Sequence, residues 1–337
     1  MSPPSLLKSR SSFAPPDGKL SADSFDFEFK YESRCLWIVA LDGSNLSFRA
    51  LRLCAFLMNP KNLQRGQRDN VVVVNVLKPG DPDDKNDHLW GDAKNELIKC
   101  GVFLHNIACK SIQLPDGWEV GDALVYFANH AGVGHSCSAH LVLGAQGIDK
   151  QAGGKMAHVG SIATQCMAKV KVPITIVKNS WGTRDGERDG FGRPIRVGRD
   201  GNPKSGLHIM CCVDGSPTGD AAFDLATSLC REGDSLQAVH VTGFLAKRTL
   251  LAEQKYTLEC EKVKETRKLQ DCSFLKVPAV KGSVSDALVE ASHDADLLVM
   301  GTIELANIKK RHILGSIAMG IAKHCDTHMT IIKNFAN

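Results

Sequence analysis

Two copies of one pattern fill most of this chain, and the duplication limits the folds it can adopt. The first copy opens with Leu36–Ser44 and closes with Gly160–Ala163, and the second opens with His208–Ser216 and closes with Gly315–Ala318. The offset between matched residues falls from 172 at the opening to 155 at the close, so the copies differ in length between the matched segments. Length changes confined to connections are typical of a repeated fold.

Composition favours a soluble, cytoplasmic protein of two domains. A chain of 337 residues exceeds what one hydrophobic core usually holds, and the 23% of charged residues is ordinary for a globular protein. No run approaches the ~18 apolar residues that span a bilayer. The net charge of +4 forms no basic stripe, so we expect neither membrane nor nucleic acid as a partner. The 12 cysteines contain no Cys-x-x-Cys pair, and we expect reduced thiols.

The duplication divides the chain into four parts. Residues 1–33 are rich in Ser and Pro and are predicted to be a disordered tail. A transit function for this tail is open, although its acidic residues disfavour one. Residues 34–179 form the first predicted domain and residues 206–337 the second. The intervening residues 180–205 are rich in Gly, Arg and Asp and are predicted to be a solvated linker.

Each copy alternates short apolar runs with amphipathic stretches of helical length. This alternation predicts an α/β fold with two tandem Rossmann-like domains, each a five-stranded parallel sheet flanked by helices. The strands are expected at 36–41, 70–77, 102–107, 139–143 and 174–177 in the first copy, and at 209–213, 236–241, 274–280, 297–300 and 329–332 in the second. Helices are expected at 48–57, 92–99, 221–230, 247–269, 284–292 and 316–324.

Two features of each copy follow strands whose carboxyl ends should meet, which is where open α/β sheets bind ligands. Asp-Gly-Ser follows the first strand, beginning at Asp42 and at Asp214. A loop after the fourth strand ends in Gly-Ser where the last helix begins, at Ser161 and at Ser316. Helix amides and glycine favour an anion there. The alternative interpretation is that these Ser and Asp residues only cap helices or form turns.

At this point the chain resembles the universal stress protein family in tandem form. The resemblance rests on Val-Asp-Gly-Ser after the first strand, on Asp-Leu-Leu-Val-Met-Gly before the loop, and on the final Thr-Ile-Ile-Lys-Asn. It covers both copies and implies an adenine nucleotide alpha hydrolase-like fold. In that family, ATP-binding members have a loop of the form Gly-x2-Gly-x9-Gly-Ser/Thr, whereas members without this loop bind no nucleotide.

Both copies depart from that loop. In the first, Gly144 and Gly147 fit the opening, but twelve residues rather than nine precede Gly160. In the second, Glu304 stands at the second glycine position, and a carboxylate there would face the phosphates. The first copy is therefore the better candidate. By resemblance, the predicted binding residues are Asp42, Val76, Gly144, Gly147, Gly160 and Ser161 in the first copy and Asp214, Gly301, Gly315 and Ser316 in the second.

Other clusters carry weaker signals. His130, His135, Cys137 and His140 could be drawn as a zinc site, but the spacing is not that of a zinc finger and a loop is the favoured interpretation. The basic run 309–312 is typical of a solvated face, although it could attract a polyphosphate or an acidic partner.

Three functions are weighed on this basis. The first is binding of an adenine nucleotide, ATP or AMP with Mg²⁺ as a further option, in stress response or signalling. The second is an interaction or structural module that binds protein partners and no nucleotide. The third is a nucleotide hydrolase, but no convincing catalytic acid or base and no Gly-x4-Gly-Lys-Ser/Thr loop is visible. By resemblance, the last strands of the two halves are expected to pair as an internal pseudo-dimer, and further homo-oligomerisation is left open.

Overall fold

A computed structural model gives the architecture of the chain. The residues it describes are 19–29, 33–58, 68–82, 84, 87–134, 137–146, 159–178, 182–188, 194–197, 203–204, 206–242, 246–279, 283–303 and 315–334. Ten strands form one mixed sheet whose order is β11-β10-β9-β12-β13-β5-β4-β1-β2-β3. No helix among these residues has the length and apolarity needed to cross a membrane.

The first half contributes five parallel strands in the order β3-β2-β1-β4-β5. The strands are β1 (Ser33–Ala40), β2 (Arg68–Leu77), β3 (Ile107–Gln113), β4 (Ser138–Gly144) and β5 (Ile174–Val177). The helices are α1 (Asn45–Leu57), α2 (Asp87–Lys99), α3 (Val120–Gly134) and α4 (Ser161–Lys169), with 3-10 turns η1 (Ala22–Phe25) and η3 (Leu104–Asn106).

The second half repeats this order as β11-β10-β9-β12-β13. Its strands are β9 (His208–Cys212), β10 (Ser235–Thr242), β11 (Asp271–Pro278), β12 (Leu297–Ile303) and β13 (His328–Asn334). Its helices are α5 (Pro217–Leu229), α6 (Ala246–Arg267), α7 (Val284–Ala291) and α8 (Ser316–His324), with the 3-10 turn η5 (Ser292–Asp294). The predicted fold class, two tandem Rossmann-like units, is confirmed.

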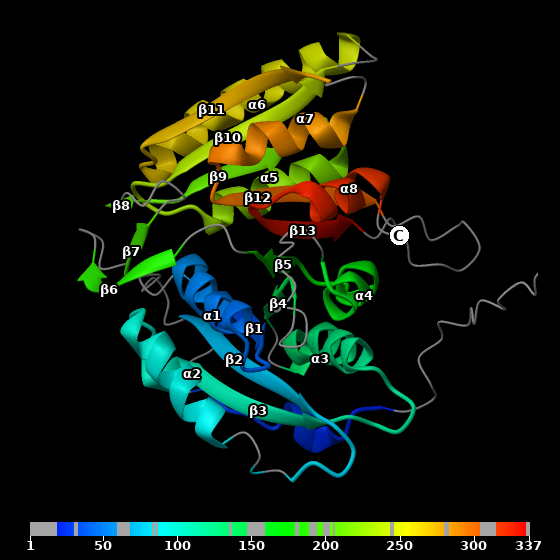
Figure 1. Ribbon diagram of the computed structural model, residues 1–337. Coiled ribbons are helices and arrows are strands. Elements are labelled where there is room, and N and C mark those ends of the chain that lie inside the picture. Colours follow the sequence, from blue (N-terminus) through cyan, green and yellow to red (C-terminus); the bar gives the residue numbers. More distant parts are fainter. Residues whose placement is uncertain are drawn as a thin grey trace, which may run out of the picture.

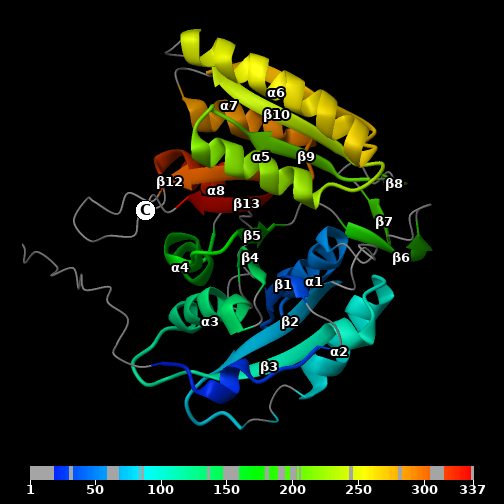
Figure 2. The ribbon, with the colours of Figure 1, turned by 180° about the vertical axis from the view of Figure 1, so that it is seen from behind.

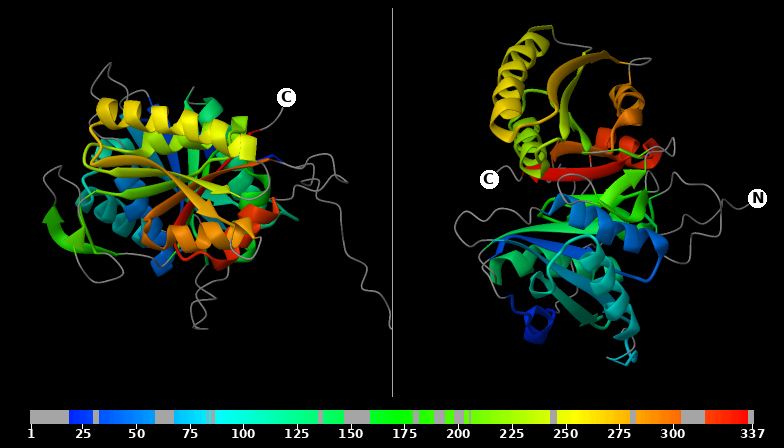
Figure 3. Two further views of the ribbon diagram at one scale, coloured as in Figure 1. Left: turned by 90° about the horizontal axis from the view of Figure 1, so that it is seen from above. Right: turned by 90° about the vertical axis from the view of Figure 1, so that its left-hand side faces the viewer.

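The central strands form because their apolar runs are covered on both faces. Val71, Val72, Val73 and Val74 of β2 are fully buried in succession, as expected of a parallel strand between two helical layers. In Figure 1, α7 and α8 lie in front of the second half's sheet, and in Figure 2, from behind, α5 and α6 come to the front. The right view of Figure 3 shows these helices on both sides of the strands.

The two halves join through their last strands, in the middle of Figure 1. β13 and β5 are antiparallel, with Met329 opposite Ile176 and Ile331 opposite Ile174. This pairing covers two edges that would otherwise be open to aggregation. The predicted internal pseudo-dimer is confirmed.

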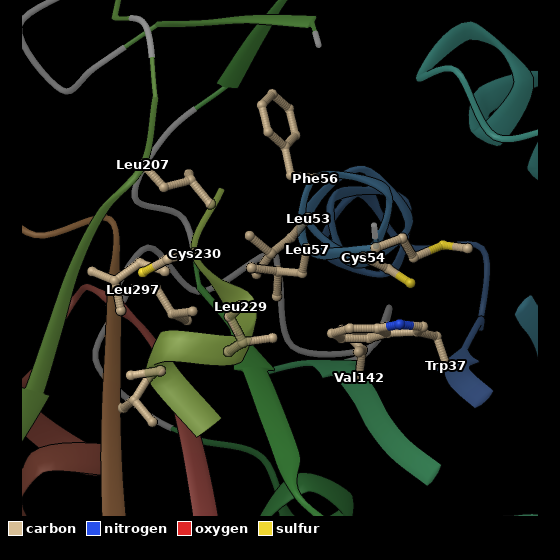
Figure 4. Close-up of a cluster of buried hydrophobic side chains, with 14 of the residues drawn as sticks. Trp37, Leu53, Cys54, Phe56, Leu57, Val142, Leu207, Leu229, Cys230 and Leu297 are labelled. Atoms are coloured by element: carbon tan, nitrogen blue, oxygen red, sulfur yellow. The ribbon is translucent and has the colours of Figure 1, made fainter. Parts of the chain in front are cut away.

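Each layer of helices packs into a core of its own, and each core contains residues of both halves. One core contains buried residues from α1, α2, α5 and α6, and the other contains buried residues from α3, α4, α7 and α8. Figure 4 shows part of the first core, where Leu53 and Leu57 of α1 point toward Leu229 of α5. Burial of this kind stabilises by about 25 cal/mol per Å² of apolar surface, so the halves are held by more than strand pairing.

Three predictions differ from the structure. The strand expected at 102–107 was misplaced, because that stretch holds η3 and the strand β3 begins at Ile107. β3 lies at the edge of the sheet and only two of its seven residues are buried, so it lacks a continuous apolar run. The predicted linker contains a three-stranded antiparallel sheet of β6 (Gly182–Arg188), β7 (Pro194–Val197) and β8 (Pro203–Lys204).

The third difference lies in the predicted disordered tail, whose residues 19–29 are packed against the first half. Phe25 stacks on Phe127 of α3 with ring centroids 5.2 Å apart, and Leu20 and Phe27 are buried in the core. Lys110 of the edge strand β3 donates a hydrogen bond to the carbonyl of Asp26. This segment is therefore part of the first domain's core.

Candidate functional site

Each half has a cavity at the same place in its fold. The cavity of the first half holds about 520 Å³ and that of the second about 430 Å³. Both lie at the carboxyl ends of the first and fourth strands of their half, where the strand order reverses. Volumes of ~300 to 1,000 Å³ are typical of small-molecule sites. Because β5 and β13 are antiparallel, the strands of the two halves run in opposite directions. The two cavities therefore open at opposite ends of the strands.

The acid after the first strand lines the cavity in both halves. An oxygen of Asp42 accepts a hydrogen bond from the backbone amide of Ser44 at 2.9 Å. Ser44 then caps α1 by accepting from the amide of Ser47 at 3.1 Å. Asp42 thus shapes the turn, as the turn interpretation expected, and its carboxylate also lies on the cavity wall.

The second half repeats this arrangement. Asp214 accepts from the amide of Ser216 at 3.0 Å and from its hydroxyl at 2.6 Å, and Ser216 caps α5 through the amide of Gly219. The glycine between acid and serine has a positive φ in both halves, +83° at Gly43 and +76° at Gly215. Glycine adopts this conformation without strain, which explains why both turns contain it.

The last helix of each half begins at the cavity without a side-chain cap. The N-caps of α4 and α8 are Gly160 and Gly315, which have no side chain, while Ser161 and Ser316 are the first helical residues. The capping interpretation of these two serines is therefore wrong. Helix N-termini carry amides without an intrahelical partner and the positive end of the dipole. Gly160 and Ser161 line the first cavity and Gly315 and Ser316 line the second, so both helix starts lie at a cavity wall.

A glycine near the carboxyl end of the fourth strand, Gly144 in β4 and Gly301 in β12, allows close packing of strand and helix. A Cβ on Gly301 would lie 2.4 Å from the carbonyl oxygen of Thr218 in α5, and one on Gly144 would lie 3.0 Å from the Cβ of Leu46 in α1. Both glycines also line their cavities. Their small size brings the first helix of each half against the end of the fourth strand.

The end of the second strand supplies residues that the sequence pattern did not single out. Val76 lines the first cavity, and its neighbour Asn75, which was not predicted, donates to the carbonyl of Leu41 at 2.5 Å. Strand registers make His240 the equivalent of Asn75, and Nδ1 of His240 donates to the carbonyl of Val213 at 2.9 Å. Different side chains thus bind the same backbone position, just before the acid. Their different types hid this equivalence in the sequence.

Two further side chains on the cavity walls bear on chemistry. Lys78, an exposed residue after β2, lines the first cavity and brings a positive charge to it. Cys212 lines the second cavity, and burial raises the pKa of its thiol, so it stays protonated and is a poor nucleophile at neutral pH.

Some predicted residues lie outside the described part of the chain. These are Gly147, Glu304, His135 and the basic run 309–312. Among the described residues no group of three or more His, Cys, Asp or Glu side chains could hold a metal ion. His140 is buried on β4 and bonded to Thr175, while His130 is exposed on α3 and bonded to the carbonyl of Tyr126, so the structure gives these two histidines separate roles.

Comparisons with known proteins agree with this architecture. The model of the universal stress protein family matches residues 207–333. A universal stress protein from Archaeoglobus fulgidus DSM 4304 aligns with 91% of this chain and 98% of its own, at 16% identity and a TM-score of 0.53. A putative universal stress protein from Pseudomonas aeruginosa UCBPP-PA14 aligns with 90% of this chain and 94% of its own, at 14% identity and a TM-score of 0.52. No curated protein sequence matches the chain.

The family match covers the second half, and the structural likeness covers both halves together. The first half has the strand order, the Asp-Gly-Ser turn and the glycine-capped last helix of the second. Residues 207–333 match the model of the universal stress protein family, and the first half of the chain repeats the fold of this domain.

Proposed function

We propose that this protein binds an adenine nucleotide, ATP or AMP, and acts as a nucleotide-responsive protein in stress response or signalling. One observation carries the proposal: in each half, a helix that begins at a glycine without a side-chain cap opens onto a cavity of ligand size. The first helix at the same cavity is capped by its own serine, so the two helix termini differ in what they offer a ligand.

The charges of the first cavity suggest how a nucleotide would lie in it. The dipole and amides at the start of α4 attract negative charge, and so does the ammonium of Lys78. The phosphates would lie near Gly160 and Ser161, and the nucleoside would lie toward Asp42 and Val76, which also line the cavity. A carboxylate suits the amino groups and hydroxyls of a nucleoside and repels phosphate.

The first half is proposed as the main site. Its cavity is larger, about 520 Å³ against about 430 Å³, and it has Lys78 on its wall. The second cavity is lined by Asp214, His240 and Thr302 together with apolar side chains such as Leu288. We propose that it takes a nucleotide with fewer phosphates.

Matched variants at the two helix starts test the proposal. Ser161→Glu and Ser316→Glu each place a carboxylate where the phosphates would lie, at exposed positions where an acid favours the helix. Ser161→Ala and Ser316→Ala are the controls because they keep the backbone amides. Calorimetric titration of ATP, AMP and adenosine, with and without Mg²⁺, gives the affinities.

We expect Ser161→Glu to weaken ATP binding at least tenfold, which is about 1.4 kcal/mol, and Ser161→Ala to change it less than threefold. Mass spectrometry of whatever small molecule accompanies the purified protein gives an independent identification. Wild-type protein without affinity for any adenine nucleotide would refute the proposal and favour the interaction module. Phosphate release that an Asp42→Asn change abolishes would favour the hydrolase instead.

A further inference from the structure

Two equivalent lysines are buried where the halves meet. Lys178 directly follows β5 and Lys333 lies near the end of β13, and their exposed fractions are 4% and 7%. In each copy the lysine precedes an asparagine at the end of the last strand. A lysine this deeply buried needs partners for its ammonium group, because an unpaired charge is costly away from water.

Each ammonium finds its partner in the opposite half. Nζ of Lys333 donates to the carbonyl of Ala168 in the last turn of α4, at 2.6 Å. Nζ of Lys178 donates to the carbonyl of Ala322 in the last turn of α8, at 2.7 Å, and to that of Cys325. These are the carbonyls that a helix leaves without an intrahelical partner, at the negative end of its dipole.

The two helices held in this way are those whose amino ends open onto the cavities. Each helix has nine residues and is therefore about 14 Å long. Its amino end lies at one cavity, and its carboxyl end accepts the hydrogen bond from the lysine of the other half. A cation at the carboxyl end of a short helix adds to the attraction that its amino end exerts on an anion. It also fixes the helix along its axis, which fixes the amides that would contact the anion.

The lysines are also tied to the cavity of their own half. Lys333 is paired in the sheet with Thr302, a buried residue on the wall of the second cavity. Lys178 follows Val177, which is paired with Gly144 and accepts a hydrogen bond from the amide of Ala145 on the wall of the first cavity. Each lysine therefore connects one cavity wall to the helix that begins at the other cavity.

We propose that Lys333 and Lys178 are positioning residues that complete the anion site of the opposite half. This inference rests on the proposed function for the identity of the anion. The placement of the two helices by the lysines stands on its own and has its own measurement below.

Ligand titration on single-site proteins tests the first part. Ser316→Glu leaves the first site active and Ser161→Glu leaves the second. In the Ser316→Glu protein we expect Lys333→Met to weaken ATP binding at least fivefold and adenosine binding less than twofold, because adenosine carries no phosphate. In the Ser161→Glu protein, Lys178→Met should weaken ATP binding and spare adenosine binding in the same way. In the Ser316→Glu protein, Lys178→Met should have little effect. Equal losses for ATP and adenosine, or equal losses at both sites, would show that the lysines only hold the halves together.

Amide hydrogen exchange tests the second part without any ligand. Lys333→Met should speed exchange in residues 161–169 more than in 316–324, and Lys178→Met should do the reverse. A rise confined to the mutated half, or a uniform rise, would overturn the inference. Lys333→Gln keeps a hydrogen-bond donor without the charge, so it supplies a folded protein if methionine does not. Absence of ATP and adenosine binding in the parent proteins would count against the proposed function alone, because the exchange pattern still decides the positioning role.

Discussion

Acid should weaken this fold through one histidine at the junction of the halves. His140 on β4 is 2% exposed, stacks on Trp37 at 4.5 Å and bonds through Nε2 to the hydroxyl of Thr175 at 2.8 Å. Thr175 in turn bonds to the hydroxyl of Thr330 across the β5–β13 pairing, at 2.7 Å. Burial lowers the pKa of His140 to about 3 from its ordinary value of 6.5, because a charged imidazole would lose its hydration there.

The sign and size of the effect follow from this difference. The unfolded chain binds the proton near pH 6.5 and the folded chain only near pH 3, so stability is full above pH 6.5 and is lost as the pH falls between these values. At pH 5 the protonated form of His140 in the unfolded chain exceeds the neutral form about thirtyfold. This lowers the free energy of unfolding by about 2 kcal/mol.

Urea unfolding at pH 7.5 and pH 5.0 measures this loss, with His140→Phe as the comparison. The phenyl ring can still stack on Trp37, and the hydroxyl of Thr175 keeps Thr330 as a partner. The other histidines are the same in both proteins, so only the difference between their pH dependences counts. We expect the wild type to lose about 2 kcal/mol more than the variant. Equal losses in the two proteins would refute the reasoning.

Three further outcomes are expected from thermal unfolding of single variants. Gly301→Ala should destabilise the fold by about 1 to 3 kcal/mol and Gly144→Ala by less. The added Cβ would meet a carbonyl oxygen at 2.4 Å in the first variant and a side-chain Cβ at 3.0 Å in the second. Equal effects would contradict this packing. Ser44→Ala should cost about 1 kcal/mol and Ser161→Ala less than about 0.5 kcal/mol, since only Ser44 caps its helix; the opposite order would restore the capping role of Ser161. Phe25→Ala should destabilise by about 1 to 3 kcal/mol through the lost ring stacking; no change would mean that residues 19–29 do not belong to the core.

The sequence predicted best those elements that the duplication repeats. β5 and α8 have the bounds that were expected, since Pro173 directly precedes the apolar run of β5 and the Gly-Ser pair repeated in both copies marks the start of α8. β3 was misplaced because it is a half-exposed edge strand with polar residues among its apolar ones. Phe25, Phe27 and Phe29 alternate in the tail, and that spacing was the available signal that the segment packs against the core.

The candidate site was predictable in part for the same reason. Repeated motifs marked the turn at Asp42 and the start of α4, and the structure brings both to one cavity. The equivalence of Asn75 and His240 could not be read from the sequence, because it depends on strand register and backbone partners. The repeated Lys-Asn endings were visible, but their crossed partners are a tertiary property of the antiparallel junction.

The most direct test of nucleotide binding is to observe the backbone amides at the start of α4 during an ATP titration. Nuclear magnetic resonance of ¹⁵N-labelled protein can follow the amide signals of Ser161, Ile162 and Ala163, which begin that helix. If phosphate binds at this helix terminus, these signals shift with ATP and shift much less with adenosine. Unchanged signals at saturating ATP would contradict the account.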